Sequence, residues 1–428
     1  MKWRMRYLTM FVSALLLVAL SFVLWTSNQK KILRIEVYAG SSWDVPNSRE
    51  NRVLDNIIHQ FEKSHSNVKV VYESGIPKKD YDNWLAEKIL KGEQADVFMV
   101  PENDFSMLAS SGAFKSLDSL ISKEEAATYY PVAYQAGQYQ GHSYALPIES
   151  NPVMMCVNKD LLGKEGISIP DSNWTLEDLY AICQKVTKDT DGDGLIDQYG
   201  ITDYTWKQAL VAYNGHLRNQ NGVNIDSVEM HQALSFISKL DSLNQRYKVT
   251  SNDFDEGKVA FYPMSLAQYR TYKPYPYHVA KYSRFSWTCI PMPAAKAGIP
   301  ATQVKTSLFA MSSKTKQDKL AWEFMKLLCQ NHKNQQELFA KSQGTSVLTS
   351  VVKSSQTKKI LQADDFGLDS LTSQRLDHMM KHSVLDISRD LDYHSLERLD
   401  YLLGNALKNN EIDSILPSIQ REMEETGK

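Results

Sequence analysis

Apolar and polar side chains in the first part of the chain follow two alternating periods. Residues 33–39 (LRIEVYA) and 68–72 (VKVVY) show strand patterns, and residues 96–100 (DVFMV) form a continuous buried-type strand. Apolar positions at helical spacing lie between these strands, over residues 54–61 and 81–89. Strands that alternate with helices predict a parallel α/β sheet with helices on both faces.

Later segments continue this alternation and lead into a helical tail. Thr175 and Asp178 form a capping-box pattern ahead of an apolar stripe, which predicts the start of a helix. The chain after about residue 354 is predicted to be helical, because its apolar positions recur at helical spacing. The other predicted elements are strands at residues 153–157, within 254–262, at 288–293 and at 308–312, and helices around 206–213, 233–243 and 320–328.

The N-terminus combines positive charge with a long apolar run. Lys2, Arg4 and Arg6 precede residues 7–25, which carry no charged side chain. Trp25 stands where a cleavage site would need a small residue, and no lipobox cysteine follows. We therefore favour an uncleaved signal anchor over residues 1–31, with cleavage near Ser27 as the alternative. The basic residues place the N-terminus inside and the remaining chain outside the cytoplasm.

The composition argues for an ordinary globular protein of two domains. The 428 residues exceed what one hydrophobic core usually supports. Hydrophobic residues make up 43% and charged residues 23%, which argues against disorder or a fibrous repeat. A net charge of −2 provides no basic field for nucleic acid.

The four cysteines are scattered and show no C-x-x-C spacing, which argues against a zinc site. Buried thiols that pack as small hydrophobic groups are the simplest interpretation. One disulfide, between Cys156 and Cys183, stays open as an alternative.

An acidic loop with the spacing of a calcium site follows the helix that starts after Thr175. The segment DTDGDGLIDQYG places Asp189, Asp191, Asp193 and Asp197 at positions one, three, five and nine of an EF-hand-type loop. Position twelve is Gly200, where such loops normally have a bidentate glutamate. The sequence leaves two interpretations, a calcium site and a structural acidic turn.

No motif predicts a catalytic centre. The chain has no G-x-S-x-G elbow, H-E-x-x-H motif or Walker loop. His378 and His382 have the spacing of a metal pair, but the glutamate of a zinc motif is missing. The paired carboxylates of a glycosidase remain an alternative, since their spacing lies in space and not in sequence. We therefore predict no catalytic residue.

Polar loops follow two of the predicted strands. In sheets of this kind, ligands bind beyond the carboxyl ends of the strands. Residues 41–44 (SSWD) and 102–104 (END) occupy such positions. They are candidate ligand contacts, although each polar residue could instead cap the next helix.

Several motifs, in their order along the chain, are similar to those of the family 1 extracellular solute-binding proteins. These proteins are the sugar-binding receptors of ABC importers, with the fold of maltose-binding protein. The order of the motifs is as characteristic as any one of them. They are ADVFMVPENDFSMLASSGAFKSLDSLI, YALPIES, CVNKDLLGKEGI, NWTLEDLYAICQKVT, DGDGLIDQYGI, FDEGKVAFYPMS, WTCIPMP and KLAWEFMKLLCQNHKNQQELFAKSQGTSVL.

The resemblance implies an α/β, two-lobed periplasmic-binding-protein fold of type II, here with an N-terminal signal anchor and a helical C-terminal tail. The first lobe would comprise residues 33–144 and 293–343, and the second lobe residues 145–292 and 344–428. Two departures stand out. Val157 replaces the usual tyrosine before the Asn-Lys turn, which leaves ligand identity open. The missing lipobox cysteine implies tethering by the N-terminal helix, or release, in place of acylation.

The resemblance also implies a function without catalysis. A monomer would capture a mono- or oligosaccharide between its lobes and deliver it to the transmembrane subunits of an ABC permease. Aromatic faces would stack on the sugar, and carboxylates and amides would bind its hydroxyls. Expected contacts are Trp43, Asp44, Glu102, Asn103 and Glu149 from the first lobe and the crossover, and Trp206, Asn214, Ser265, Tyr269 and Trp287 from the second.

Two other functions stay open. An anchored binding protein could report ligand to a membrane sensor kinase, and a secreted glycoside hydrolase is the enzymatic alternative. No cofactor is expected, apart from calcium in the acidic loop.

Overall fold

A computed structural model of the chain describes residues 30–43, 50–101, 103–245, 247–272, 285–364, 369–409 and 411–426. Within these residues one ten-stranded sheet runs through the molecule. Its main path is β2 (Val68–Glu73), β1 (Lys31–Glu36), β3 (Val97–Val100), β12 (Thr302–Met311), β6 (Ala145–Asn158), β10 (Val259–Ser265) and β7 (Tyr199–Ile201). Off this path, β11 (Trp287–Ile290) and β13 (Thr345–Ser346) pair with β6, and β14 (Ser383–Leu385) pairs with β12.

Helices and two short hairpins surround this sheet. The hairpins are β4–β5 (Gln138–Tyr139, His142–Ser143) and β8–β9 (Arg218–Asn219, Gly222–Val223). The helices of the first half are α2 (Glu50–Ser64), α3 (Lys78–Lys91), α4 (Phe105–Ser110), α5 (Lys123–Ala126), α6 (Pro131–Ala136), α7 (Lys159–Lys164), α8 (Leu176–Val186) and α9 (Trp206–Ala212). The later helices are α10 (Val228–Leu243), α11 (Ser251–Asp255), α12 (Leu266–Tyr272), α14 (Asp318–Cys329), α15 (His332–Lys341), α16 (Thr349–Val352), α17 (Ser355–Asp364), α18 (Ser373–Lys381), η1 (Ile387–Asp390), α19 (Tyr393–Asn409) and α20 (Ile412–Thr426).

The sheet is mixed, and the prediction of a parallel sheet is correct only for part of it. Besides the first strands, β10 pairs in parallel with β7 and β12 pairs in parallel with β14. β1 pairs in parallel with β2 and with β3, as strands joined by crossover helices do. β12 is antiparallel to both β3 and β6. The prediction failed here because β12 comes from late in the chain, where it enters the sheet between two earlier strands.

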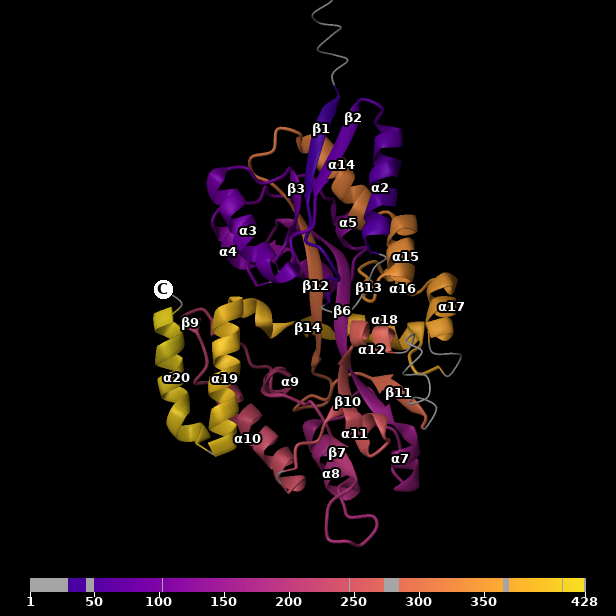
Figure 1. Cartoon of the computed structure of the whole chain (residues 1–428), viewed down its shortest axis with the longest axis vertical. Helices are drawn as coiled ribbons and strands as arrows, with labels where there is room; N and C mark the ends of the chain where they lie inside the picture. Colours follow the sequence, from indigo (N-terminus) through magenta and orange to yellow (C-terminus); the bar gives the residue numbers. More distant parts are fainter. Residues whose placement is uncertain are drawn as a thin grey trace, which may run out of the picture.

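β6 is the longest strand and joins the two halves of the molecule (Figure 1). Its first part pairs with β12, and its last part pairs with β10 and β11. Only residues 153–157 of it were predicted as a strand. Pro147 and Pro152 interrupt the apolar pattern, and proline is unusual inside a sheet.

Helices cover the upper strands on two sides. In Figure 1, α3 and α4 lie to one side of β1, β2 and β3, and α2 and α15 lie to the other. The apolar stripe of α2 is buried through Val53, Ile57 and Phe61, which are at most 2% exposed. Burial of such side chains supplies most of the driving force for this packing.

The C-terminal tail packs onto the lower half. Leu399 and Leu403 of α19 and Leu416 and Ile419 of α20 belong to one buried cluster with residues of α8, α9 and α10. Gln420 of α20 also accepts a hydrogen bond from the backbone N–H of Ile225 at 2.6 Å. The predicted helical tail is therefore largely confirmed. It also contains β14, a short strand whose register with β12 is not visible in the tail sequence.

The predicted boundaries of the two lobes stay a prediction. Within the described part of the chain, no helix has the length and apolarity needed to cross a membrane. The predicted anchor segment, residues 7–25, lies outside the described residues.

Candidate ligand-binding site

A small, partly open pocket lies where the upper and lower halves meet. It is bordered by β12 and β14, by the turn that follows β14, and by the helices α4 and α6. Its lining residues are Phe105, Ala136, Val304, Thr306, Leu308, Leu385, Asp386 and Arg389. The cavity is small and mostly apolar, with one acid and one guanidinium at its edge.

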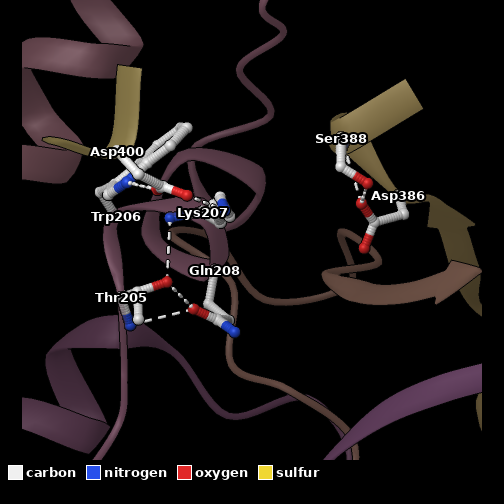
Figure 2. A network of polar contacts seen from close by, with 7 residues as sticks. All are labelled: Thr205, Trp206, Lys207, Gln208, Asp386, Ser388 and Asp400. Atoms are coloured by element: carbon white, nitrogen blue, oxygen red, sulfur yellow. Dashed lines mark hydrogen bonds and ion pairs between the residues drawn. The ribbon is translucent and has the colours of Figure 1, made fainter. Parts of the chain in front are cut away.

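Arg389 connects the two sides of this cavity. Its guanidinium lies 5.6 Å from the ring centre of Phe105 in α4, and it donates to the Ala136 carbonyl at 3.2 Å. Nearby, the Asp386 carboxylate accepts hydrogen bonds from the Ser388 N–H at 2.8 Å and from the Ser388 hydroxyl (Figure 2). The turn that carries Arg389 is thus held in shape by its own side chains.

Three carboxylates, Asp82, Asp104 and Asp392, lie close enough to interact electrostatically. Burial, together with the negative charges of Asp82 and Asp392, raises the pKa of Asp104 to about 6. Asp82 belongs to α3, Asp104 directly precedes α4, and Asp392 directly precedes α19. We call these three residues the acidic cluster. It combines side chains from the N-terminal sheet region and from the C-terminal tail.

The surroundings of the acidic cluster distinguish its members. Burial raises the pKa of Asp82, and its interactions with Lys78 and His394 oppose this. Burial also opposes ionisation of Asp392, but hydrogen bonds from Ser395 hold its pKa below the ordinary value. At pH 7 the cluster is therefore anionic, and Asp104 is the member that gains a proton most easily on acidification.

An exposed aromatic ring adjoins the acidic cluster. Tyr393 follows Asp392 directly and is 58% exposed, whereas most large aromatic side chains of the described residues are buried. Carboxylates accept hydrogen bonds from hydroxyl groups, and an exposed ring can stack on an apolar sugar face. The arrangement suits a neutral polyhydroxylated ligand or a cation, and it repels anions.

Five predicted contacts lie in or near the first half and the crossover. Asp44 and Glu102 lie outside the described residues. Asn103 is half-buried next to Asp104, so it is close to the acidic cluster. Trp43 is buried, and within the described residues its indole Nε1 has no hydrogen-bond partner.

The Glu149 carboxylate is hydrogen-bonded to other groups of the protein. It is 3% exposed, and its Oε1 accepts from the Gly344 N–H at 2.8 Å and from the Ser342 hydroxyl. It borders a different cavity of about 620 Å³, which is lined mainly by apolar residues such as Val53, Ile57 and Phe309. This carboxylate holds the turn after α15 against β6.

The five predicted contacts of the second half have visible structural roles. Trp206 is 5% exposed, and its indole N–H donates to Asp400 of α19 at 2.8 Å (Figure 2). Tyr269 and Trp287 are buried with ring centres 5.4 Å apart. Asn214 is exposed, and its backbone adopts the left-handed conformation just after α9. The Ser265 hydroxyl accepts a hydrogen bond from the Gln268 N–H at 3.2 Å.

Four residues of this region were not predicted from the sequence as ligand contacts: Asp82, Arg389, Asp392 and Tyr393. Asp82 lies within a predicted helix, and the other three lie in the predicted helical tail. The signal in the tail is the segment SRDLDYH, residues 388–394, which is polar and interrupts the apolar stripes. Only the fold brings this segment next to the loop that precedes α4.

The acidic loop has part of the geometry of a calcium site. Carboxylate oxygens of Asp189, Asp191 and Asp193 lie within 4.8 Å of one another. Asp197 accepts instead from the Thr190 N–H at 2.8 Å and from its hydroxyl at 2.7 Å. At position twelve, a Cβ on Gly200 would lie 2.4 Å from the Cβ of Cys183. Packing against α8 thus excludes a glutamate from the position where the twelfth ligand would be.

The cysteines are buried, as predicted, but the suggested pairing of Cys156 with Cys183 is wrong. Cys183 of α8 packs against Gly200, whereas the sulfur of Cys156 lies 3.6 Å from that of Cys289. The error arose because the register between β6 and β11 is not visible in the sequence.

Comparisons with known proteins agree with this architecture. Residues 56–364 match a family model described as bacterial extracellular solute-binding protein. A maltotriose-binding protein of Pyrococcus abyssi is 25% identical over 138 residues, which are 32% of this chain and 30% of that protein. A putative binding protein of Brucella abortus is 25% identical over 261 residues, 58% of this chain and 61% of that protein. The chain thus matches only part of the length of these curated relatives.

Solved structures show the same fold. The sugar-binding protein MalE from Xanthomonas citri has a TM-score of 0.73 at 15% identity, covering 92% of this chain and 97% of that one. The cyclic alpha-maltosyl-1,6-maltose binding protein from Arthrobacter globiformis has a TM-score of 0.70 at 14% identity, covering 92% and 98%. The predicted two-lobed α/β fold is therefore confirmed. The match to the family model supports the predicted location outside the cytoplasm. The chain belongs to the bacterial extracellular solute-binding protein family.

Proposed function

We propose that this protein captures a mono- or oligosaccharide between its lobes and delivers it, unaltered, to the transmembrane subunits of an ABC-type permease. The acidic cluster carries the proposal, because Asp104 lies near carboxylates from both the N-terminal sheet region and the tail. The relatives described as maltotriose-binding and sugar-binding support the ligand class. The binding unit would act as a monomer, tethered by residues 1–31 or released.

Closure of the lobes would depend on contacts that ligand makes to both sides at once. A ligand shifts an open–closed equilibrium only by its difference in affinity for the two states. Hydroxyl groups placed between Asp104 and Asp392 would donate to both carboxylates and offset their repulsion. Tyr393, on the same side as Asp392, would supply a stacking face.

Substitution of the cluster should weaken saccharide binding. In isothermal titration with maltose, maltotriose and a cyclic maltooligosaccharide, we expect Asp104→Asn and Tyr393→Ala to raise Kd about tenfold or more, the loss of a charged hydrogen bond or a stacking face. Affinity of the wild-type protein should also fall as pH drops from 7 to 5, since Asp104 is protonated below about 6. The Asp104→Asn variant should lose most of this pH dependence.

Tyr401→Ala is the matched control, because Tyr401 lies on the same helix and is 62% exposed. Its Kd should equal that of the wild-type protein. The carbohydrate proposal would be refuted if no saccharide gave either binding heat or a thermal shift. Mass spectrometry of recovered ligand tests the absence of hydrolysis, and cleaved products would favour the glycosidase alternative.

We also propose that calcium occupies the acidic loop. The support is the approach of Asp189, Asp191 and Asp193 and the spacing of the loop. Without a twelfth carboxylate ligand, we expect a weak site with Kd of about 10⁻⁴ to 10⁻³ M. Calcium at 5 mM, about five to fifty times such a Kd, should raise the melting temperature of the wild-type protein but not of Asp191→Asn. Equal melting curves of the wild-type protein with calcium and with chelator would indicate a purely structural turn.

A further inference from the structure

Cys156 and Cys289 face each other on neighbouring strands. β6 and β11 are antiparallel, and their register places Cys289 directly opposite Cys156. The two sulfur atoms are 3.6 Å apart, and both residues are fully buried. Two thiols that meet in this way are a candidate for a covalent link between the strands.

The hydrogen bonds of the ladder show which kind of pair this is. The N–H of Cys289 donates to the Ser370 carbonyl at 2.9 Å, which directs it away from β6. Ser286 lies three residues before Cys289, opposite Lys159. Its carbonyl accepts a hydrogen bond from the Lys159 N–H at 2.8 Å, so residues 286 and 159 form a hydrogen-bonded pair. Hydrogen-bonded and non-hydrogen-bonded pairs alternate along an antiparallel ladder. Cys156 and Cys289 therefore form a non-hydrogen-bonded pair.

This kind of pair has the spacing that a disulfide needs. Opposite Cα atoms in non-hydrogen-bonded pairs are about 4.5 Å apart, closer than in the hydrogen-bonded pairs. A disulfide spans Cα distances of about 4.4 to 6.8 Å. The sulfur atoms can thus approach to bonding distance, about 2.05 Å, by side-chain rotation without a change of register.

The other two cysteines lack such a partner within the described residues. Burial raises the pKa of the Cys183 thiol in α8 and of the Cys329 thiol at the end of α14. Cys183 packs against Gly200, and the Cys329 sulfur lies 4.0 Å from the Leu146 carbonyl. Only one pair of the four is therefore placed for bonding.

We propose that Cys156 and Cys289 form a cross-strand disulfide in the protein outside the cytoplasm, where oxidising conditions preserve such bonds. The oxidant would be the disulfide of a thiol oxidoreductase. One S–S bond forms between the two strands as the S–S bond of the oxidoreductase breaks. The two thiol protons and two electrons pass to the oxidoreductase, which leaves as a dithiol. Because both sulfurs are fully buried, the exchange would occur during folding, before the sheet closes.

The bond would fasten β11 to the central strand. β11 carries Trp287, whose ring packs on Tyr269 of α12, and it follows residues 273–284 in the chain. The disulfide would join residues 133 positions apart in the chain, and closing so long a loop limits the freedom of the unfolded chain. Reduction should therefore lower the melting temperature, by about 5 °C or more.

Thiol counting on protein exported from cells tests the proposal. The protein is denatured without reductant in the presence of N-ethylmaleimide, which alkylates free thiols, and its mass is measured by mass spectrometry. We expect two adducts before reduction and four after it, and a non-reduced peptide map should contain Cys156 linked to Cys289. Cys156→Ser should show three adducts, whereas the control Cys183→Ala should show one adduct and keep the link.

Four adducts in the exported protein, and again after incubation with oxidised glutathione during refolding, would overturn the proposal. A linkage of Cys156 to any other cysteine would also overturn it. These outcomes do not depend on saccharide binding, so the disulfide and the proposed function can fail separately.

Discussion

Gly344→Ala is expected to lower the free energy of unfolding by about 3 kcal/mol, which is a typical cost of overpacking a tight core site. A Cβ at this position would lie 2.4 Å from the Oε1 and 2.6 Å from the Cγ of Glu149. Glu149 has little room to retreat, because it sits in the central strand β6 and is hydrogen-bonded to Ser342 and to the Gly344 N–H. The change would therefore separate the turn after α15 from β6. Urea unfolding followed by circular dichroism measures the loss.

Gly404→Ala is the matched control for this substitution. Gly404 lies inside α19, and a Cβ there would meet no other atom within 4 Å. Alanine favours a helix interior over glycine by about 0.5 to 1 kcal/mol, so this variant should be slightly more stable than the wild-type protein. Wild-type stability of Gly344→Ala would show that Glu149 can turn away at little cost.

Arg270→Met should lower the free energy of unfolding by a similar amount, about 3 kcal/mol, as expected when one partner of a buried ionic network is removed. Arg270 is 6% exposed and lies in α12 of the lower half. It donates to the carbonyls of Phe339 and Gly344 at 2.8 and 2.9 Å and to the Asp364 carboxylate at 3.0 Å. Its guanidinium also lies 4.7 Å from the ring centre of Phe339. The loss is measured by the same urea unfolding.

Two further variants serve as comparisons for Arg270→Met. Arg398→Met removes an exposed ion pair with Glu422 on the tail helices and should cost less than about 1 kcal/mol. Arg270→Lys keeps the charge but lacks the planar fork that reaches several acceptors, so it should be intermediate. Equal stability of Arg270→Met and Arg398→Met would mean that the buried network contributes no more than a surface pair.

The two substitutions concern one region, where α12 of the lower half meets the turn after α15 of the upper half. Arg270 contacts the Gly344 carbonyl, and Glu149 contacts the Gly344 N–H. Gly344→Ala and Arg270→Met would both loosen this turn, so their effects on the free energy of unfolding should not be additive. A double variant measures this coupling.

The local signals in the sequence were sufficient for most of the elements. The Thr175 capping box exists as predicted, with the Asp178 N–H donating to the Thr175 hydroxyl at 3.2 Å. β6 was predicted at only part of its length, because prolines interrupt its apolar run. The antiparallel entry of β12 was missed, because strand order is determined by contacts between distant parts of the chain.

The candidate site was harder to predict than the fold. Position after a strand predicted that the loop with Asn103 contacts ligand, and the proposed site includes Asp104 of this same loop. Aromatic residues such as Trp206 and Tyr269 were ambiguous, because a ring that packs in a core and a ring that binds sugar have the same sequence pattern. Asp392 and Tyr393 were not predicted, since the proximity of Asp392 to Asp104 depends on a fold that brings the C-terminal tail back to the loop before α4.

The pairing of β6 with β12 limits how the lobes can move. Residues 145–152 of β6 are paired with residues 304–310 of β12, and the register shifts between Ser307 and Leu308. Pulling the lobes straight apart would break this ladder, whereas twisting it costs little, because strands are twisted already. An irregular position in a ladder bends more readily than its regular neighbours. The lobes should therefore rotate relative to each other about a single hinge axis, which lies near Ser307.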